Sequence, residues 1–127
     1  MPQRMHNICF IASFSLFASA LNALAGGVTV ERATAKAQGD SYRFDVTLSH
    51  ADTGWDHYAD AWEVRLEDGT VLGTRTLLHP HVNEQPFTRS LGGVVVPKGQ
   101  DTVLIFAHDS QHGWTTAGFR LDLNSTK

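Results

Sequence analysis

The chain has 127 residues, of which 18% are charged, and its formal net charge is −3 with neutral histidine. This length accommodates one domain with its own apolar core. The mildly acidic composition, which lacks any run of Lys and Arg, argues against nucleic acid and anionic membranes as partners.

Residues 1–25 have the features of a secretory signal peptide. Arg4 precedes an apolar run over residues 8–25, and the run ends in Ala23-Leu24-Ala25, the small-residue pattern of a cleavage site. An uncleaved membrane anchor is the alternative, because the run approaches the roughly 18 residues that a span needs. Cys9 lies inside the run, which argues against a lipoprotein anchor at that residue. We therefore predict a periplasmic or secreted protein without stable membrane insertion after cleavage.

Residues 26–127 are predicted to form a single domain that follows the leader. This part keeps nine of the ten basic side chains and all 13 acidic ones, so its net charge is −4 with neutral histidine. It contains neither Cys nor Met. Disulfides, thiolate ligands and thioether ligands are therefore unavailable to it.

Alternation with a period of two residues recurs throughout this domain, whereas helical periodicity is absent. In residues 61–67, for example, Trp62, Val64 and Leu66 share one face, which predicts that Trp62 belongs to the core, and Glu63 is expected to face outward with the other charged residues. Residues 102–108 are apolar on both faces and are expected to form a buried central strand. Gly39-Asp40 and Asp68-Gly69 are turn signals. The predicted strands cover residues 28–38, 41–49, 61–67, 70–78, 89–96, 102–108 and 115–123.

These seven short strands predict an all-β fold, namely an immunoglobulin-like or fibronectin-III-like β-sandwich. If neighbouring strands run in opposite directions, alternate connections lie at the same end of the molecule. The segments over residues 49–60, 79–88 and 108–114 are then expected to share one end.

All six histidines outside the leader fall within these three segments. Neutral imidazole is the commonest protein ligand for zinc, copper and nickel, and several carboxylates lie nearby in the sequence. We predict a divalent transition metal, copper or zinc, bound directly by His79, His81 and His108, with His112, His50 or His57 completing the coordination. A calcium site built from Asp52, Asp56 and Asp60 is disfavoured, since their spacing is not that of an EF-hand.

His79-Pro80-His81 is the sharpest local motif for metal binding. Proline pushes the preceding residue into extended geometry, and residues i and i+2 of an extended segment point the same way, about 6.6 Å apart. Two imidazoles placed in this way can converge on one ion. The structural alternative is a rigid loop in which a histidine caps a backbone carbonyl.

An interaction module is the alternative function. Four aromatic residues flank the histidines, and such loops can grip a periplasmic protein or a glycan, with pH dependence supplied by the histidines. The same rings could instead pack the loops against one another. No nucleophile motif is present, so binding is favoured over catalysis, and metal-assisted hydrolysis is the enzymatic reaction left open. The sequence does not indicate an oligomeric state. These aromatic residues are Trp55, Tyr58, Phe87 and Trp114.

Three segments, GWDHYADAWEV, LLHPHVNEQPFTRSLGGV and FAHDSQHGW, lie at residues 54–64, 77–94 and 106–114. Through them the chain resembles a group of small secreted proteobacterial proteins of unassigned function, over nearly all of residues 50–114. This resemblance implies a periplasmic setting and assigns no role to any residue. The chain does not match the sandwich-type copper-resistance proteins beyond general architecture, because their N-terminal histidine and Met-rich segment are missing.

Overall fold

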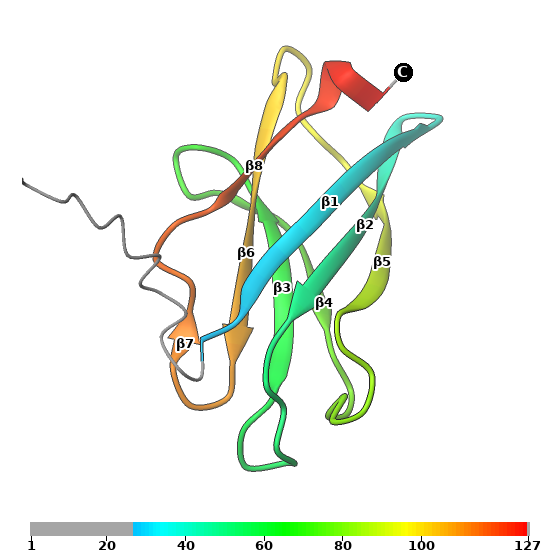
Figure 1. Ribbon diagram of the computed structural model, residues 1–127. Helices are drawn as coiled ribbons and strands as arrows, with labels where there is room; N and C mark the ends of the chain where they lie inside the picture. The colour runs from blue at the N-terminus through cyan, green and yellow to red at the C-terminus, as the bar shows by residue number, and fades with distance from the viewer. Residues whose placement is uncertain (1–26, 127) are drawn as a thin grey trace, which may run out of the picture.

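The computed structural model describes residues 27–126 (Figure 1), so the predicted signal peptide lies outside the described residues. Within this range the chain forms eight strands and one short 3-10 helix. No helix in this range is long and apolar enough to span a membrane. The elements are β1 (Thr29–Gln38), β2 (Ser41–Ser49), β3 (Ala59–Arg65), β4 (Val71–Thr76), β5 (Phe87–Val94), β6 (Thr102–Asp109), β7 (Gly113–Trp114), β8 (Phe119–Asp122) and η1 (Leu123–Thr126).

The strands form two antiparallel sheets, which confirms the all-β prediction. One sheet has the order β1-β2-β5, and the other has the order β4-β3-β6-β7, with β8 also paired to β6. Figure 1 shows β1 and β2 crossing in front of β3 and β6. Buried side chains from both sheets belong to one apolar cluster, so the core lies between the sheets.

Period-2 alternation explains which side chains enter this core. Phe44, Val46 and Leu48 of β2 are fully buried, and so are Val103 and Ile105 of β6. Their neighbours on the opposite face of β6 are only half-buried, so the expectation that residues 102–108 are buried on both faces holds for the inner face alone. Burying large apolar side chains in this way is the main favourable contribution to folding.

Trp62 of β3 is fully buried, which confirms the predicted core position. Its neighbour Glu63 was expected to face water, yet Glu63 is buried too. Arg65 lies 2.5 Å from Glu63 Oε1 and covers the Phe106 ring at 4.1 Å from its centroid. An ion pair and a cation–π contact therefore shield the outer face of this sheet from solvent.

The predicted number of strands, seven, is wrong, because a short strand, β7, forms within the predicted connection at residues 108–114, and the last predicted strand at residues 115–123 keeps only the part that is β8. β7 ends at Trp114, and β8 begins only at Phe119. Between them the chain passes so close to β6 that a Cβ atom at Gly118 would lie 2.7 Å from Phe106 Cε2. This close approach of the backbone requires glycine and interrupts the pairing. The other strand boundaries differ from the predicted ones by a few residues, as strand ends commonly do.

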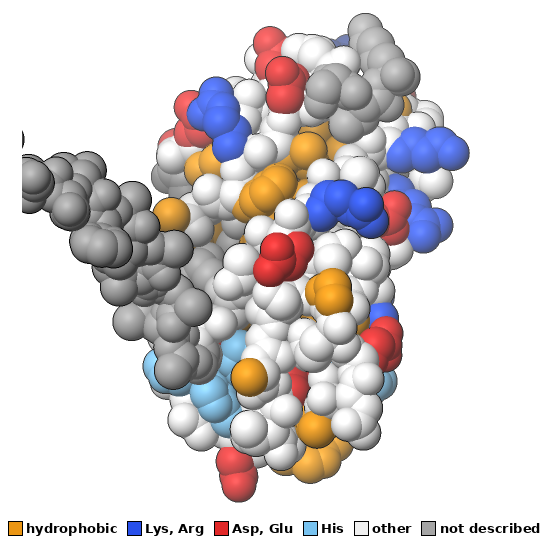
Figure 2. Space-filling model, viewed as in Figure 1, with side chains coloured by type: hydrophobic (Ala, Val, Ile, Leu, Met, Phe, Trp, Pro, Cys, Tyr) orange, Lys and Arg blue, Asp and Glu red, His pale blue; other side chains and the backbone are white. Residues whose placement is uncertain are grey.

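The three histidine-bearing connections gather at one end of the molecule, as the alternating strand directions predict. They join β2 to β3, β4 to β5 and β6 to β7, and Figure 1 shows all three at the lower end of the view. Figure 2 shows histidine side chains on the surface of the same end. The fold thus delivers imidazoles from three separate connections to one region.

Candidate metal centre

His50, His57 and Asp109 form the compact group of potential ligands at this end. His50 directly follows β2, His57 closes a small bridge with Gly54, and Asp109 is the last residue of β6. Each offers one ligand atom, and these three atoms lie within 4.8 Å of one another. Two segments that are distant in sequence, the β2–β3 connection and the end of β6, therefore supply two imidazoles and one carboxylate at a single point.

Asp109 is fully buried and is held by the turn that follows it. Its Oδ1 accepts hydrogen bonds from the backbone amides of Gln111 (2.8 Å) and His112 (2.6 Å). Burial alone would raise the pKa of Asp109, but these two hydrogen bonds and the His112 ring outweigh it and leave the pKa below its usual value. Asp109 is therefore a carboxylate at neutral pH, as a metal ligand must be.

His50 is oriented by a second buried carboxylate, Asp52. The Nδ1–H group of His50 donates to Asp52 Oδ1 at 2.5 Å, which directs Nε2 toward Asp109 Oδ2 at 3.4 Å. Asp52 also accepts hydrogen bonds from the amides of Ala59 (3.0 Å) and His81 (2.7 Å). Metal-binding histidines characteristically donate their second ring N–H to a carboxylate in this manner, because the contact fixes the ring and its tautomer.

The separations between ligand atoms match those around a small ion. His50 Nε2 lies 3.4 Å from one oxygen of Asp109, and His57 Nε2 lies 3.5 Å from the other. Ligands at 2.0–2.1 Å from a tetrahedral Zn²⁺ are about 3.3–3.4 Å from one another. These two separations run to different oxygens of Asp109, and the three ligand atoms lie within 4.8 Å of one another, so the imidazoles would shift toward Asp109 as an ion binds.

The charges at this point also suit a cation. Asp52 and Asp109 have fully buried side chains, and among residues 27–126 neither contacts a Lys or an Arg. Backbone amides and imidazoles are the partners of these two carboxylates, so neither has a Lys or an Arg to compensate its charge, which is costly in a protein interior. A divalent cation would supply the compensating charge.

His112 lies at the edge of this group. Its Nδ1 is 2.9 Å from Asp109 Oδ2 and 3.2 Å from His57 Nε2, while its side chain is about half exposed. His50, His57 and His112, which the sequence assigned to complete a coordination sphere, are thus brought together around Asp109.

His79 and His81 lie next to each other, with ring centroids 4.7 Å apart. The positively charged side chain of Arg89 lies beside them. Arg89 Nη2 donates to His81 Nε2 at 2.8 Å, and the His81 ring stacks on Phe87. Burial lowers the pKa of His81, and the charges of Arg89 and His79 lower it further. The contact with Arg89 occupies Nε2 of His81, whereas Nδ1 is buried without a hydrogen-bond partner. The ligand role of His79 and His81 stays a prediction.

His108 lies on the outer face of its sheet and not with the compact group. Its Nδ1 is 2.5 Å from Asp60 Oδ1, and its ring packs edge-on against Trp114. Asp52 and Asp60, which the calcium alternative would combine, thus bind two different histidines. The ligand role of His108, too, stays a prediction.

The sequence assigned neither Asp109 nor Asp52 to the transition-metal site: Asp109 was only one of the carboxylates near the histidines, and Asp52 belonged to the disfavoured calcium alternative. The signal for Asp109 is its phase, because it continues the buried series Val103, Ile105 and Ala107 at period 2. An acidic residue at the end of an inward-facing series requires polar partners or an ion. The sequence alone contains no comparable signal for Asp52.

Comparisons with known proteins give one informative match. A protein of Halomicrobium mukohataei that carries the name "Putative lipoprotein" is 43% identical to this chain over 89 residues. The match covers 70% of this chain and 43% of the relative, so the chain spans less than half of the relative's length. No known protein-family model matches the chain. No solved structure matches it either.

Proposed function

We propose that this protein is exported and binds a divalent transition metal, copper or zinc, through His50, His57 and Asp109, for storage or delivery of the ion. The observation that carries the proposal is the convergence of three ligand atoms within 4.8 Å of one another. The Asp52–His50 hydrogen bond and the uncompensated buried carboxylates support it.

The donor set narrows the choice of ion. Two imidazole nitrogens and a carboxylate, without sulfur, suit Zn(II) and Cu(II) better than Cu(I). The separations of 3.4 and 3.5 Å between imidazole nitrogens and Asp109 oxygens are close to those between ligands of tetrahedral Zn²⁺, and both ions remain candidates. Three protein ligands leave a coordination position for water or for a ligand from a partner.

Export and the type of fold belong to the same proposal. Arg4, the apolar run and Ala23-Leu24-Ala25 are the features of a leader, and the similar protein carries "lipoprotein" in its name. The sheet orders β1-β2-β5 and β4-β3-β6-β7 are those expected of a fibronectin-III-like sandwich.

Calorimetric titration of the exported protein, purified without a histidine tag, tests the metal site. At pH 7.5 we expect one equivalent of Zn(II) or Cu(II) to bind, and His57→Ala to weaken binding at least tenfold. His79→Ala is the matched control and should bind as the wild type does. Binding weaker than about 100 μM for both ions, or binding that survives His57→Ala unchanged, would exclude this site.

An interaction module is the second candidate, favoured by one observation. Trp55 at the tip of the β2–β3 connection is 67% exposed and meets Tyr58 edge-on, with ring centroids 5.6 Å apart. Exposed aromatic rings of this kind are typical of contact surfaces. If this function is the correct one, Trp55→Ala abolishes capture of a periplasmic protein or glycan, and Zn(II) and Cu(II) do not bind.

A further inference from the structure

The four groups around the candidate metal centre differ sharply in exposure. The side chain of His112 is 52% exposed and that of His57 is 16% exposed, whereas those of His50 and Asp109 are 0% exposed. They also form a continuous series of contacts, since His112 Nδ1 is 3.2 Å from His57 Nε2, and both histidines reach Asp109. The series therefore runs from solvent to the buried end of the site.

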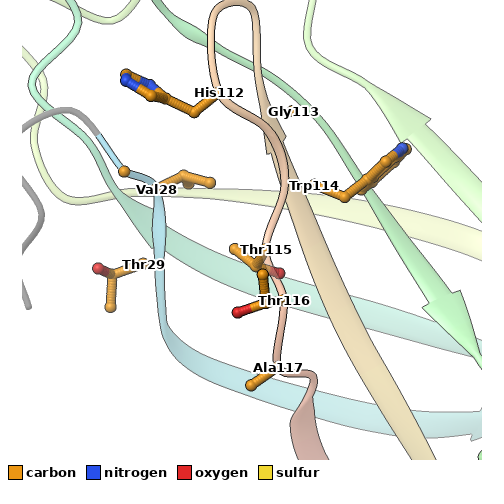
Figure 3. Close-up of a pocket in the computed structure, with 9 residues that line it drawn as sticks. Val28, Thr29, His112, Gly113, Trp114, Thr115, Thr116 and Ala117 are labelled. Carbon is orange, nitrogen blue, oxygen red and sulfur yellow. The ribbon is translucent and has the colours of Figure 1, made fainter.

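The backbone of His112 is held by a hydrogen bond of its own, separate from the contacts of its ring. Its amide donates to Asp109 Oδ1 at 2.6 Å, and Gly113, with φ of +78°, turns the chain directly after it. Figure 3 shows the His112 side chain projecting from the β6–β7 connection, near Val28 and at the edge of a pocket that also borders Thr29 and Thr116. The ring can thus turn toward solvent while the backbone stays in place.

We propose that His112 is the capture ligand of the metal centre: it binds the ion first and passes it to His57, His50 and Asp109. This inference rests on the proposed function. It adds that the site loads and unloads through one exposed imidazole, as delivery of an ion requires. His112 then governs the rates of exchange more than the affinity.

The physical reason is access. A hydrated ion cannot touch His50 or Asp109 while both are covered, so its first protein ligand must be an exposed one. Of the two exposed groups His112 protrudes further, and while its Nδ1–H donates to Asp109, the lone pair of Nε2 is available to the ion. One water leaves the ion as Nε2 binds, and no proton has to move. Turning the ring then brings the ion beside His57, where the remaining waters are replaced one at a time.

Stopped-flow measurement with Cu(II) tests this order of events. Cu(II) quenches tryptophan fluorescence, and Trp55 lies two residues from His57. The exported protein is compared with His112→Ala, with His112→Asn, which keeps an N–H donor for Asp109, and with His79→Ala, which removes an exposed histidine outside the group. A chelator added to the loaded protein gives the dissociation rate.

We expect both His112 variants to lower the association and dissociation rates together by about tenfold, leaving Kd within about threefold of wild type. His79→Ala should behave as wild type. An unchanged association rate with a tenfold weaker Kd would make His112 a permanent ligand, and a faster association rate would make it an obstruction; either result overturns the proposal. Failure of the proposed metal site can be told apart from failure of this inference. If the site itself is wrong, Cu(II) does not quench the fluorescence of the wild type, or His57→Ala binds Cu(II) as the wild type does.

Discussion

The side chain of Asp52 holds the candidate ligand His50 and also links the β2–β3 connection to the β4–β5 connection. This side chain has no exposed surface, and its two oxygens accept the ring N–H of His50 and the amides of Ala59 and His81. Three donors from three parts of the chain thus converge on one carboxylate. Such a group stabilises the fold and orients the ligand at the same time, because each partner would be left buried and unpaired without it.

Replacing Asp52 with Asn should weaken both properties. The amide group of Asn presents N–H donors where the carboxylate accepts, so at least one of the three hydrogen bonds is lost, at a cost of about 1–3 kcal/mol. His50 also loses the contact that fixes its tautomer, and metal affinity should fall about 10–100-fold. Denaturant melts and zinc titration measure the two effects. Asp56→Asn, in the exposed part of the same connection, is the control; an Asp52→Asn protein with wild-type affinity would contradict the assigned role.

The strands were largely predictable at the scale of the element, because side-chain alternation is a local property of the sequence. β2 has the bounds expected from Tyr42, Phe44, Val46 and Leu48. The break between β7 and β8 was not predictable, since it follows from contact between Gly118 and Phe106 of another strand. A tertiary contact of this kind leaves no periodic trace in the sequence.

The candidate site was predictable only in part for the same reason. That the three connections share one end follows from strand order and direction. Which imidazoles meet depends on the phase of each strand: β6 turns Asp109 inward and His108 outward, and Arg89 reaches His81 from β5. A shift of one residue along a strand moves a side chain to the opposite face of the sheet, and this decides which side chain is a potential ligand.

The β4–β5 connection should make stability depend on pH through His81. Burial, then Arg89 and His79, lower the pKa of His81, while Glu84 and Asp52 oppose them without reversing the direction. Below the ordinary histidine pKa of about 6.5, the unfolded chain then binds more protons than the folded one, so stability rises with pH. The contribution of His81 to the free energy of unfolding is complete above pH 6.5. It is lost as the pH falls from there toward the lower pKa of His81 in the folded state.

His81→Gln removes the titrating group and should flatten this dependence. We expect the free energy of unfolding of the wild type to decline more than that of the variant between pH 7.5 and pH 5. Urea melts at several pH values, compared with those of His79→Gln at the exposed neighbouring position, measure the difference. Equal slopes for wild type and His81→Gln would show that His81 titrates normally in the folded state.

At the scale of the whole molecule, the metal would cross-link connections that are otherwise held only where they join the strands. His50 directly follows β2 of one sheet, whereas His57 leads into β3 and Asp109 ends β6 of the other sheet. An ion that binds all three therefore links the two sheets across the core. Because the unfolded chain holds no such arrangement, binding adds directly to the free energy of unfolding.

Metal should accordingly raise the melting temperature of the protein. Free zinc at 100 times Kd adds about 2.7 kcal/mol, which for a domain of this size corresponds to roughly 10 °C in Tm. The gain should shrink below about pH 6, where protons compete for the imidazoles. At the same zinc concentration the gain should fall to about half or less in His57→Ala, because binding there is at least tenfold weaker, and it should persist in full in His79→Ala. The Tm without metal should change little in either variant. Thermal melts by circular dichroism, with and without zinc at pH 7.5 and 5.5, provide the measurement.

A shift in Tm of equal size in His57→Ala would place the ion elsewhere. A shift that is lost only in His79→Ala would place the ion at the His79-Pro80-His81 segment.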